Sequence, residues 1–239
     1  MTQNYEIKNR WTGEVLFSCE IPDGMESGMI ARHAVKTAIA EGANLRSADL
    51  QGAYLRYANL GGSNLRDANL RSADLQGAYL RDADLQGAYL RSADLQGAYL
   101  RSADLQGAYL RDADLQGADL QGAYLRSADL QGAYLRDADL QGAYLRYANL
   151  GGSNLRDANL WGAKNAPLII TTLRWPVHIN GFGDMRIGCQ NHKVEQWKDF
   201  TDQEISRMNS DALSFWNQYK VMLLAACETH VHSAEEIEQ

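Results

Sequence analysis

Two cysteine–histidine pairs near the end of the chain are the residues best suited to chemistry. They are Cys189-Gln190-Asn191-His192 and Cys227-Glu228-Thr229-His230, each with C-x-x-H spacing. Two thiolates and two imidazoles make four ligands, the number that a structural zinc site uses. His178 and His232 could substitute as ligands. One interpretation of these residues is therefore a structural zinc site formed by Cys189, His192, Cys227 and His230.

The other interpretation of the pairs is purely structural, with no cofactor. Cys227 falls on the apolar stripe of an expected helix, Cys189 lies at the end of an expected strand, and both histidines would be solvated. A paired C-x-x-H is less specific than a paired C-x-x-C, and the 34 residues between the pairs exceed the usual spacing of a zinc finger.

Catalysis would need Cys189 as a nucleophile with His192 as its base. The sequence offers no third group to orient that base and no glycine-rich turn for an oxyanion. It also lacks a P-loop, a G-x-G-x-x-G after a strand and an H-E-x-x-H motif. We therefore expect a protein that is not an enzyme.

The elements that would position these residues fall between positions 164 and 239. The segments 168–173, 177–180 and 185–189 read as short strands. Thr201-Asp202-Gln203-Glu204 has the spacing of a capping box. An apolar stripe then continues to His230, with a break expected at Asn209-Ser210. The pattern predicts a small α+β cap or domain that could also form a homodimer.

The middle of the chain follows a strict five-residue period. A leucine stands at every fifth position from Leu45 to Leu160, and the residue two before it is alanine except at Ser63 and Ser153. Between the two stands Asp, Asn or Tyr. A helix has 3.6 residues per turn and a strand has a period of two, so neither would keep these leucines on one side. A chain that turns a corner every five residues would bury all of them.

The unit A-(D/N/Y)-L-(R/Q)-(G/S/D) resembles the A-(D/N)-L-X-X motif of the pentapeptide-repeat family. The resemblance covers residues 43–163 and implies a mainly β fold, a right-handed quadrilateral β-helix with four pentapeptides per coil. We expect about six coils, stacked at about 4.8 Å. The expected interior includes Leu45, Leu50, Leu75, Leu100, Leu115, Leu140 and Leu160.

Residues 1–42 are expected to cap the first coil. Alternating residues 5–7 and 15–21 predict a β-hairpin. Helical spacing from Glu26 to Glu41, followed by Gly42, predicts a helix. A similar hairpin and helix opens many phage and prophage proteins of the pentapeptide-repeat family, so the resemblance indicates a bacterial or phage protein.

On the surface, a near ten-residue repeat places tyrosine and arginine on two opposite faces, with aspartate on the other two. Expected binding ladders are Tyr79, Tyr99, Arg81 and Arg101 on one face, Tyr89 and Tyr109 on the opposite face, and Asp74, Asp94 and Asp114 on an acidic face. An extra unit after Gly117 shifts this phase. Tyr124, Tyr134 and Tyr144 should then lie where aspartates lay before.

Charge decides between three binding functions. The chain has a net charge of −7, but residues 43–163 balance 14 Asp against 12 Arg. A negative protein with alternating acidic faces is a poor nucleic-acid binder. Members of the resembled family that act on DNA gyrase are thought to mimic DNA, which implies an alternative function on gyrase or topoisomerase IV. The balanced charge favours instead a scaffold for a protein partner, with each aspartate bonded to its own turn.

The start of the chain and its cysteines indicate a location. Met1-Thr2-Gln3-Asn4 has no basic start or apolar core of a signal peptide. No apolar run is long enough for a membrane span. Three cysteines, an odd number, are typical of a reducing compartment. We expect a cytoplasmic protein without membrane contact.

Overall fold

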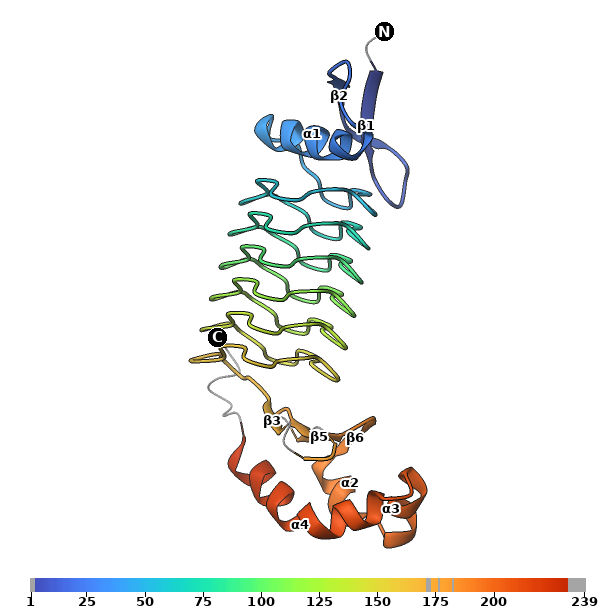
Figure 1. The fold of residues 1–239 in the computed structure, drawn as a ribbon, viewed down its shortest axis with the longest axis vertical. Helices are drawn as coiled ribbons and strands as arrows, with labels where there is room; N and C mark the ends of the chain where they lie inside the picture. The colour runs from blue at the N-terminus through green and yellow to red at the C-terminus, as the bar shows by residue number, and fades with distance from the viewer. Residues whose placement is uncertain (1–2, 171–172, 176, 182, 232–239) are drawn as a thin grey trace. The chain divides into compact units, whose positions relative to one another are not determined.

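A computed structural model of the chain describes residues 3–170, 173–175, 177–181 and 183–231. The chain forms two compact units, one through Lys164 and one from Asn165 onward, each described by itself. The first unit holds the hairpin, the first helix and all the repeats, and the second is an α+β unit (Figure 1). Within the described ranges, no helix combines the length and apolar character needed to cross a bilayer.

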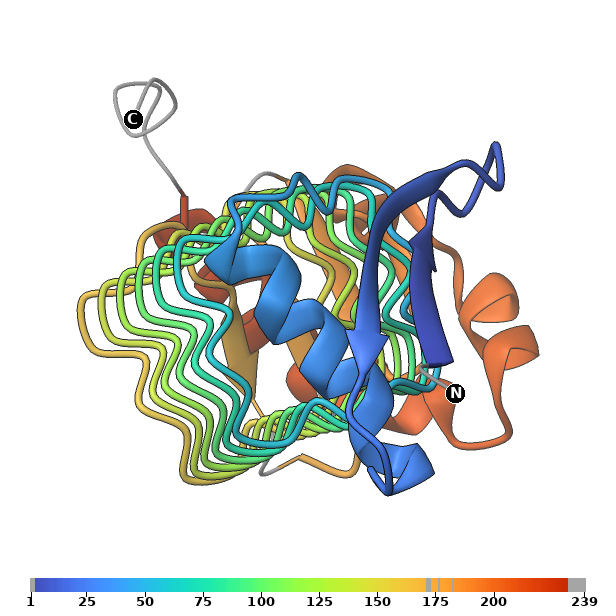
Figure 2. The same cartoon turned by 90° about the horizontal axis from the view of Figure 1, so that it is seen from above.

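The first unit begins with the expected hairpin and helix. Strands β1 (Gln3–Lys8) and β2 (Val15–Ile21) pair antiparallel, and α1 (Ser27–Ala40) follows. Ile7 and Ile21 are buried, as are Ala34, Val35 and Ala38 on one face of α1. Seen along the axis of the coils, α1 crosses the end of the solenoid (Figure 2). This arrangement confirms an N-terminal cap built from a hairpin and a helix.

The cap continues the hydrogen bonding of the first coil. Asn9, next to the end of β1, forms an antiparallel bridge with Ala48. The amide of Asp49 donates to the carbonyl of Lys8 at 2.7 Å, and the amide of Arg10 donates to the carbonyl of Ser47 at 2.8 Å. Backbone groups that would otherwise form an open edge are therefore satisfied by the cap.

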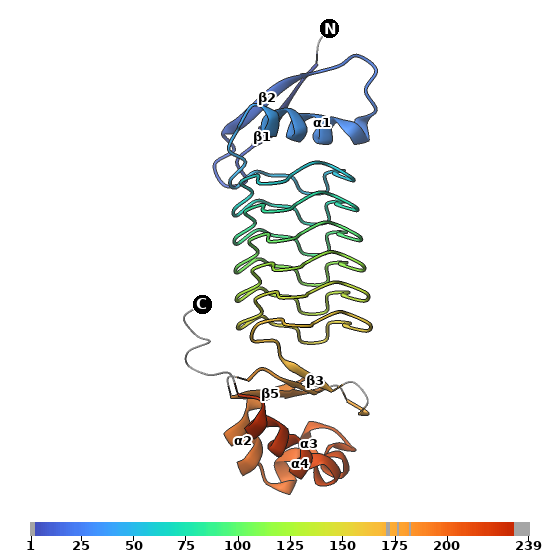
Figure 3. The same ribbon diagram turned by 90° about the vertical axis from the view of Figure 1, so that its left-hand side faces the viewer.

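The repeats form a β-helix in which each coil takes 20 residues. Parallel bridges join residue i to residue i+20, from Asp49–Asn69 to Tyr144–Lys164. Between coils, the amide of Leu100 donates to the carbonyl of Asp119 at 2.7 Å, and neighbouring coils repeat the pattern. The coils stack in a regular column (Figure 3). Four pentapeptides per coil are thus confirmed.

Each corner of a coil is a turn with one residue in the left-handed region. At one corner the amide of Ala103 donates to the carbonyl of Leu100 at 3.0 Å, and Ser102 between them has φ of 57°. This is the geometry of a type II turn, which requires positive φ at its third residue. Glycine takes this position without strain, as at Gly97 with φ of 60°. The fifth position of each repeat is therefore restricted by backbone geometry, a constraint that the leucine period alone does not predict.

The leucine column is buried along most of the solenoid. The expected interior residues at most 2 % exposed are Leu45, Leu50, Leu75, Leu100, Leu115 and Leu140. Leu160 is the exception, because it is only partly buried. It belongs to the last coil, where no further coil of the solenoid covers the interior, so its place in the closed interior stays a prediction.

The second unit contains a four-stranded antiparallel sheet in the order β3-β4-β5-β6, followed by three helices. The strands are β3 (Leu168–Ile170), β4 (Val177–Ile179), β5 (Asp184–Ile187) and β6 (Gln190–Lys193). The helices are α2 (Val194–Asp199), α3 (Asp202–Met208) and α4 (Ala212–Thr229). Residues 171–172, within the strand expected over 168–173, lie outside the described residues. The α+β class is confirmed, whereas a capping role for this unit stays a prediction.

One core joins the sheet of the second unit to its helices. Val177, Ile179 and Met185 alternate toward one face of the sheet and are at most 2 % exposed. Buried residues of the helices complete the core: Val194, Trp197, Ile205, Ala212, Phe215, Trp216, Leu223 and Cys227. The break at Asn209-Ser210 is confirmed, because α3 ends at Met208 and α4 begins at Ala212.

Candidate functional site: side-chain ladders of the solenoid

Tyrosine rings stack along the column of the coils. The ring centroids of Tyr79 and Tyr99 lie 4.9 Å apart with an interplanar angle of 6°, and those of Tyr89 and Tyr109 lie 4.7 Å apart at 24°. The separation follows the spacing of hydrogen-bonded strands, because the backbone of each coil bonds to the next. The predicted stacking of these two pairs is confirmed.

A third stack follows from the extra repeat unit. Tyr124 and Tyr144 stack at 4.9 Å and 8°, on the column that carries Asp84 and Asp104 in earlier coils. Tyr134 is bridged to Asp114 before it and Asn154 after it. As predicted, no face keeps one chemistry along its length.

The arginines beside the tyrosine stacks each have one exposed contact within the solenoid. Arg81 lies 3.4 Å from Asp82, and both side chains are more than half exposed. Arg101 donates from Nη2 to Gln121 at 2.6 Å, also at the surface. Exposed ion pairs contribute little to stability, about 0 to 1 kcal/mol. Both guanidinium groups are therefore at the surface, and the ion pair of Arg81 contributes little to stability.

The aspartates of the acidic face are engaged within the protein. Oδ1 of Asp94 accepts the amide of Gln96 at 3.1 Å, and its Oδ2 accepts a hydrogen bond from the Gln76 side chain of the preceding coil. Asp114 is held in the same way, by the amide of Gln116 at 3.1 Å and by Gln96 Nε2 at 2.8 Å. These bonds support the interpretation of the aspartates as local turn acceptors.

Asp74 follows the same local pattern at the start of this face. Its Oδ1 accepts the amide of Gln76 at 3.2 Å, and Arg56 Nε lies 3.8 Å from its Oδ2. Much of the negative charge on this face is thus used for bonding to the turns and to the neighbouring coils.

Sequence reasoning missed the contribution of the hairpin loop to this surface. Arg10 lies over the ring of Tyr89, 3.7 Å from its centroid, and Trp11 meets the same ring edge-on at 6.5 Å. Trp11 remains 65 % exposed. An arginine next to a tryptophan in a predicted hairpin turn was the signal available for this contact.

The cysteine and histidine pairs of the second unit are held by separate contacts. Cys189 is exposed in the turn between β5 and β6, whereas Cys227 is buried on α4 with its thiol 3.6 Å from the sulfur of Met185. The His230 Nε2 accepts the amide of Leu168 at 3.1 Å. His192 packs edge-on against two aromatic rings, Trp197 at 5.2 Å and Phe200 at 4.9 Å.

These placements do not assemble a metal centre. Among the described residues, which exclude His232, no group of three or more His, Cys, Asp or Glu side chains could hold a metal ion. His178 lies on β4 opposite Arg186, and burial lowers its pKa to about 4, with a smaller contribution from the charge of Arg186. The prediction of a zinc site formed by Cys189, His192, Cys227 and His230 was therefore wrong. The four residues lie on different elements and pack against different neighbours, so their side chains do not converge on one point.

The Cys189–His192 hypothesis receives no supporting contact either. Cys189 Sγ accepts a weak hydrogen bond from Gln190 Nε2 at 3.8 Å, and His192 Nε2 lies 3.4 Å from Gln190 Oε1. Gln190 thus bonds to both side chains. A nucleophile and its base would bond to each other directly.

Corners every five residues, four per coil, with leucine inside and polar ladders outside, define a quadrilateral β-helix. The profile described as pentapeptide repeats matches eight copies here, over residues 38–67, 48–87, 68–107, 93–132, 103–142 and 133–164. The chain belongs to the pentapeptide repeat family. A comparison with curated proteins found no match.

Several solved structures are similar to part of this chain. HetL, a pentapeptide repeat protein involved in heterocyst differentiation regulation from Nostoc sp. PCC 7120, is 33 % identical over 50 % of this chain and 73 % of its own, with a TM-score of 0.27. Another Nostoc protein, alr5209, is 33 % identical over 51 % of this chain and 93 % of its own, with a TM-score of 0.36. The plasmid-mediated fluoroquinolone resistance protein QnrB1 is 24 % identical over 48 % of this chain and 63 % of its own, with a TM-score of 0.38.

Proposed function

We propose that the chain is a non-enzymatic scaffold that binds a protein partner through the tyrosine and arginine ladders of the solenoid. The observation that carries the proposal is the stacked pair Tyr79 and Tyr99, which remain 48 % and 46 % exposed beside Arg81 and Arg101. Tyrosine and arginine are enriched at the hot spots of protein interfaces.

Rigidity supports this function. The backbone of every coil is hydrogen-bonded to the next, so the stacked rings are held in place before a partner arrives. Ordering flexible side chains on binding costs about 0.5–1.5 kcal/mol for each one. The stacked tyrosines are already held in place by the fold, so a partner that binds them avoids part of that cost.

The proposed partner is a protein surface that combines apolar groups with carboxylates. Apolar groups would cover the exposed tyrosine rings, and carboxylates could receive two parallel hydrogen bonds from a guanidinium. Arg81 is suited to this exchange because its present bond to Asp82 is exposed at 3.4 Å.

The experiment compares partner capture by matched variants of the whole chain. Wild-type protein, the double variant Tyr79→Ser/Tyr99→Ser and the control Tyr134→Ser are immobilised and exposed to a bacterial lysate. Tyr134 is equally exposed at 50 % but has aspartate and asparagine neighbours along its column. A partner held by wild type and control but lost from the double variant supports the proposal. Equal capture by all three contradicts it.

The alternative function is a DNA mimic that binds gyrase or topoisomerase IV as inhibitor or protector. A mimic needs carboxylates presented to solvent in place of phosphates, whereas Asp94 and Asp114 each accept at least two hydrogen bonds inside the ladder. We therefore expect no effect on gyrase supercoiling at stoichiometric excess. Inhibition, or protection against a fluoroquinolone, would favour the mimic over the scaffold.

A homodimer through the second unit is the remaining part of the proposal. Val221 and Met222 of α4 are 83 % and 45 % exposed, an apolar pair on the surface of a helix. Sedimentation of wild type against Val221→Lys tests this contact. We expect dissociation of the dimer in the variant, and a wild type that is monomeric at high concentration would refute it.

A further inference from the structure

We propose that the second unit binds a small, flat aromatic molecule that carries a hydrogen-bond acceptor. The unit contains a cavity of about 230 Å³ between the β5–β6 turn and helices α2 to α4. Its walls within the described residues are mainly Trp175, Trp197, Phe215, Trp216, Ile187 and Ile205. This site is independent of the solenoid ladders, so it would be a second binding function.

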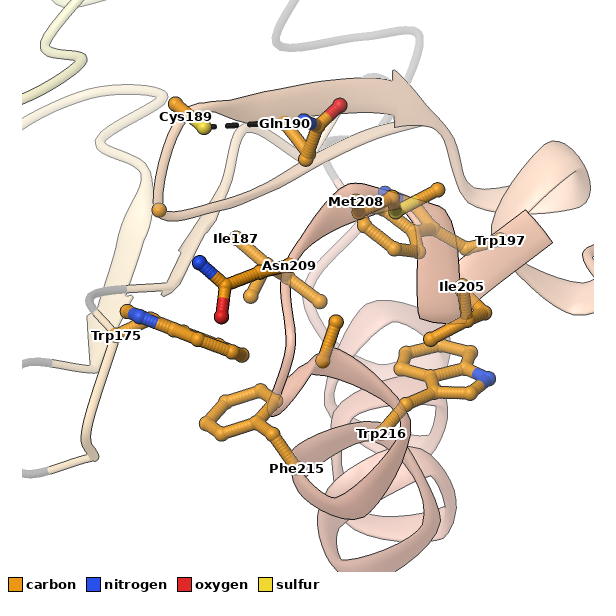
Figure 4. A pocket seen from close by; sticks show the side chains of 12 residues that line it. Trp175, Ile187, Cys189, Gln190, Trp197, Ile205, Met208, Asn209, Phe215 and Trp216 are labelled. Atoms are coloured by element: carbon orange, nitrogen blue, oxygen red, sulfur yellow. Dashed lines mark hydrogen bonds between the residues drawn. The ribbon is translucent and has the colours of Figure 1, made fainter. Parts of the chain in front are cut away.

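Two aromatic pairs shape the cavity. Trp175 and Phe215 have ring centroids 4.9 Å apart at 50°, and Trp197 and Trp216 lie 5.3 Å apart at 37°. The two pairs lie on opposite sides of the cavity, with Ile187 between them (Figure 4). Aromatic walls interact best with another ring in offset or edge contact. The shape therefore selects a flat, apolar ligand.

The side-chain amide of Asn209, at the mouth of the cavity, can orient a bound ligand. Oδ1 of Asn209 accepts the amide of Asp211 at 3.1 Å and the hydroxyl of Ser210 at 3.3 Å. These bonds assign Oδ1 and leave Nδ2 as the free donor, with no partner within the described part of the chain. Asn209 lines the cavity, and Figure 4 shows its carboxamide near Trp175 and Ile187; in the proposed complex, Nδ2 donates to an acceptor of the ligand at the mouth.

The volume limits the class of ligand. An apolar cavity of about 150 Å³ in another protein holds one benzene molecule. About 230 Å³ therefore suits one ring with a short substituent, or two fused rings. An ionised ligand is unfavourable because burial against apolar walls costs its hydration. The predicted ligand is neutral and carries a carbonyl or a similar acceptor.

The test uses two fluorinated probes of nearly equal shape with the full chain. 4-Fluoroacetophenone has a carbonyl acceptor, and 4-fluoroethylbenzene lacks it. Fluorine NMR follows the binding of each without interference from the protein. We expect both probes to bind wild type, and the ketone to bind more tightly. A wild type that binds neither probe at millimolar concentration overturns the proposal.

Two variants assign the binding to this cavity. Asn209→Asp keeps an oxygen for the Asp211 amide but removes the donor, so we expect about fivefold weaker binding of the ketone and unchanged binding of 4-fluoroethylbenzene. Ala212→Leu fills the cavity from α4, where Ala212 is 8 % exposed, and should abolish binding of both.

Circular dichroism verifies that each variant is folded. If Ala212→Leu does not fold, the comparison of the two probes on Asn209→Asp still tests the proposal. An equal loss of both probes in Asn209→Asp overturns the acceptor assignment. If folded Ala212→Leu binds both probes as tightly as wild type, the probes bind outside the cavity as an adventitious additive only, and the proposal is overturned. Tighter binding of N-acetyltryptophanamide than of the ketone would assign the cavity to a side chain of a partner protein and overturn the small-molecule proposal.

Discussion

The guanidinium carbon of Arg10 lies 3.7 Å from the ring centroid of Tyr89. Arg10 follows strand β1, whereas Tyr89 lies two bridges along its column from Asp49 in the first coil. Arg10 Nη1 also donates to the carbonyl of Asp67 at 3.2 Å. The hairpin loop therefore fastens the N-terminal cap to the side of the solenoid as well as to its end.

Removal of this contact should weaken the cap. We expect Arg10→Ala to destabilise the first coils by about 1–2 kcal/mol, because it removes one cation–π contact and one hydrogen bond. Arg10→Lys should cost less, since it keeps a cation over the ring. Native-state hydrogen exchange of amides in residues 45–70 measures the local effect. Equal protection in wild type and Arg10→Ala would contradict it.

The same substitution, leucine to alanine, can be compared at a fully buried and at a partly buried position of the leucine column. Leu100 is fully buried, whereas Leu160 in the last coil is only partly buried. We expect Leu100→Ala to cost about 3 kcal/mol through a cavity that the neighbouring coils cannot close. Leu160→Ala should cost about 1 kcal/mol. Denaturant unfolding followed by circular dichroism gives both values, and equal losses would refute the difference in packing.

The sequence was sufficient for the solenoid because its period and its motif together specify the structure. A leucine at every fifth position from Leu45 to Leu160 predicts a corner in each unit. The coil of four units, and with it the stack of Tyr79 on Tyr99, followed from the resemblance to the family rather than from the period itself. The period does not report φ. Tyr57 adopts φ of 53° in a turn position that glycine fills in other coils, because the surrounding hydrogen bonds impose the same corner on every unit.

The second unit was predictable only where its residues alternate clearly. Strand β6 was missed because Gln190–Lys193 has no apolar alternation and pairs with β5 through its backbone. The zinc hypothesis failed for a related reason. Spacing brings Cys227 and His230 onto one helix, but the fold places Cys227 against Met185 and His230 against Leu168. The cavity near Asn209 depends on three helices together, which no local pattern reports.

The acidic ladder predicts a difference between two neutral substitutions. Asp94→Asn keeps an oxygen for the amide of Gln96, just as Asn59 accepts the amide of Gly61 at 3.2 Å in another coil. The amide nitrogen of the asparagine replaces the oxygen that accepts from the Gln76 side chain, so we expect a loss of about 0.5–1 kcal/mol from that one bond. Asp94→Ala removes both acceptors and should cost about 1–2 kcal/mol. Thermal unfolding compares the variants, and an Asn variant as unstable as the Ala variant would show that charge, not turn bonding, matters.

Two buried tryptophans should respond differently to the same change. Trp197 Nε1 donates to the carbonyl of Met185 at 2.7 Å, whereas Trp216 Nε1 is buried without a hydrogen-bond partner among the described residues. Replacement by phenylalanine removes similar volume from both. We expect Trp197→Phe to cost about 1–3 kcal/mol more than Trp216→Phe, because only Trp197→Phe breaks a bond. Urea unfolding measures the loss of unfolding free energy in each variant. Equal losses would contradict a stabilising contribution from the hydrogen bond of Trp197 to Met185.

Acid should destabilise the second unit through His178. Burial and the charge of Arg186 lower the folded-state pKa of His178 to about 4, below its ordinary value of 6.5. Below pH 6.5 the unfolded chain therefore binds a proton that the folded chain does not, so stability falls as pH drops from 6.5 to about 4. The expected loss is about 2 kcal/mol, less than the full shift would give because part of the ring contacts solvent. Urea unfolding of the full chain at pH 7.5, 5.5 and 4, followed by tryptophan fluorescence, measures it. His178→Leu should flatten this dependence, and a variant with the same slope as wild type would assign the acid sensitivity to other groups.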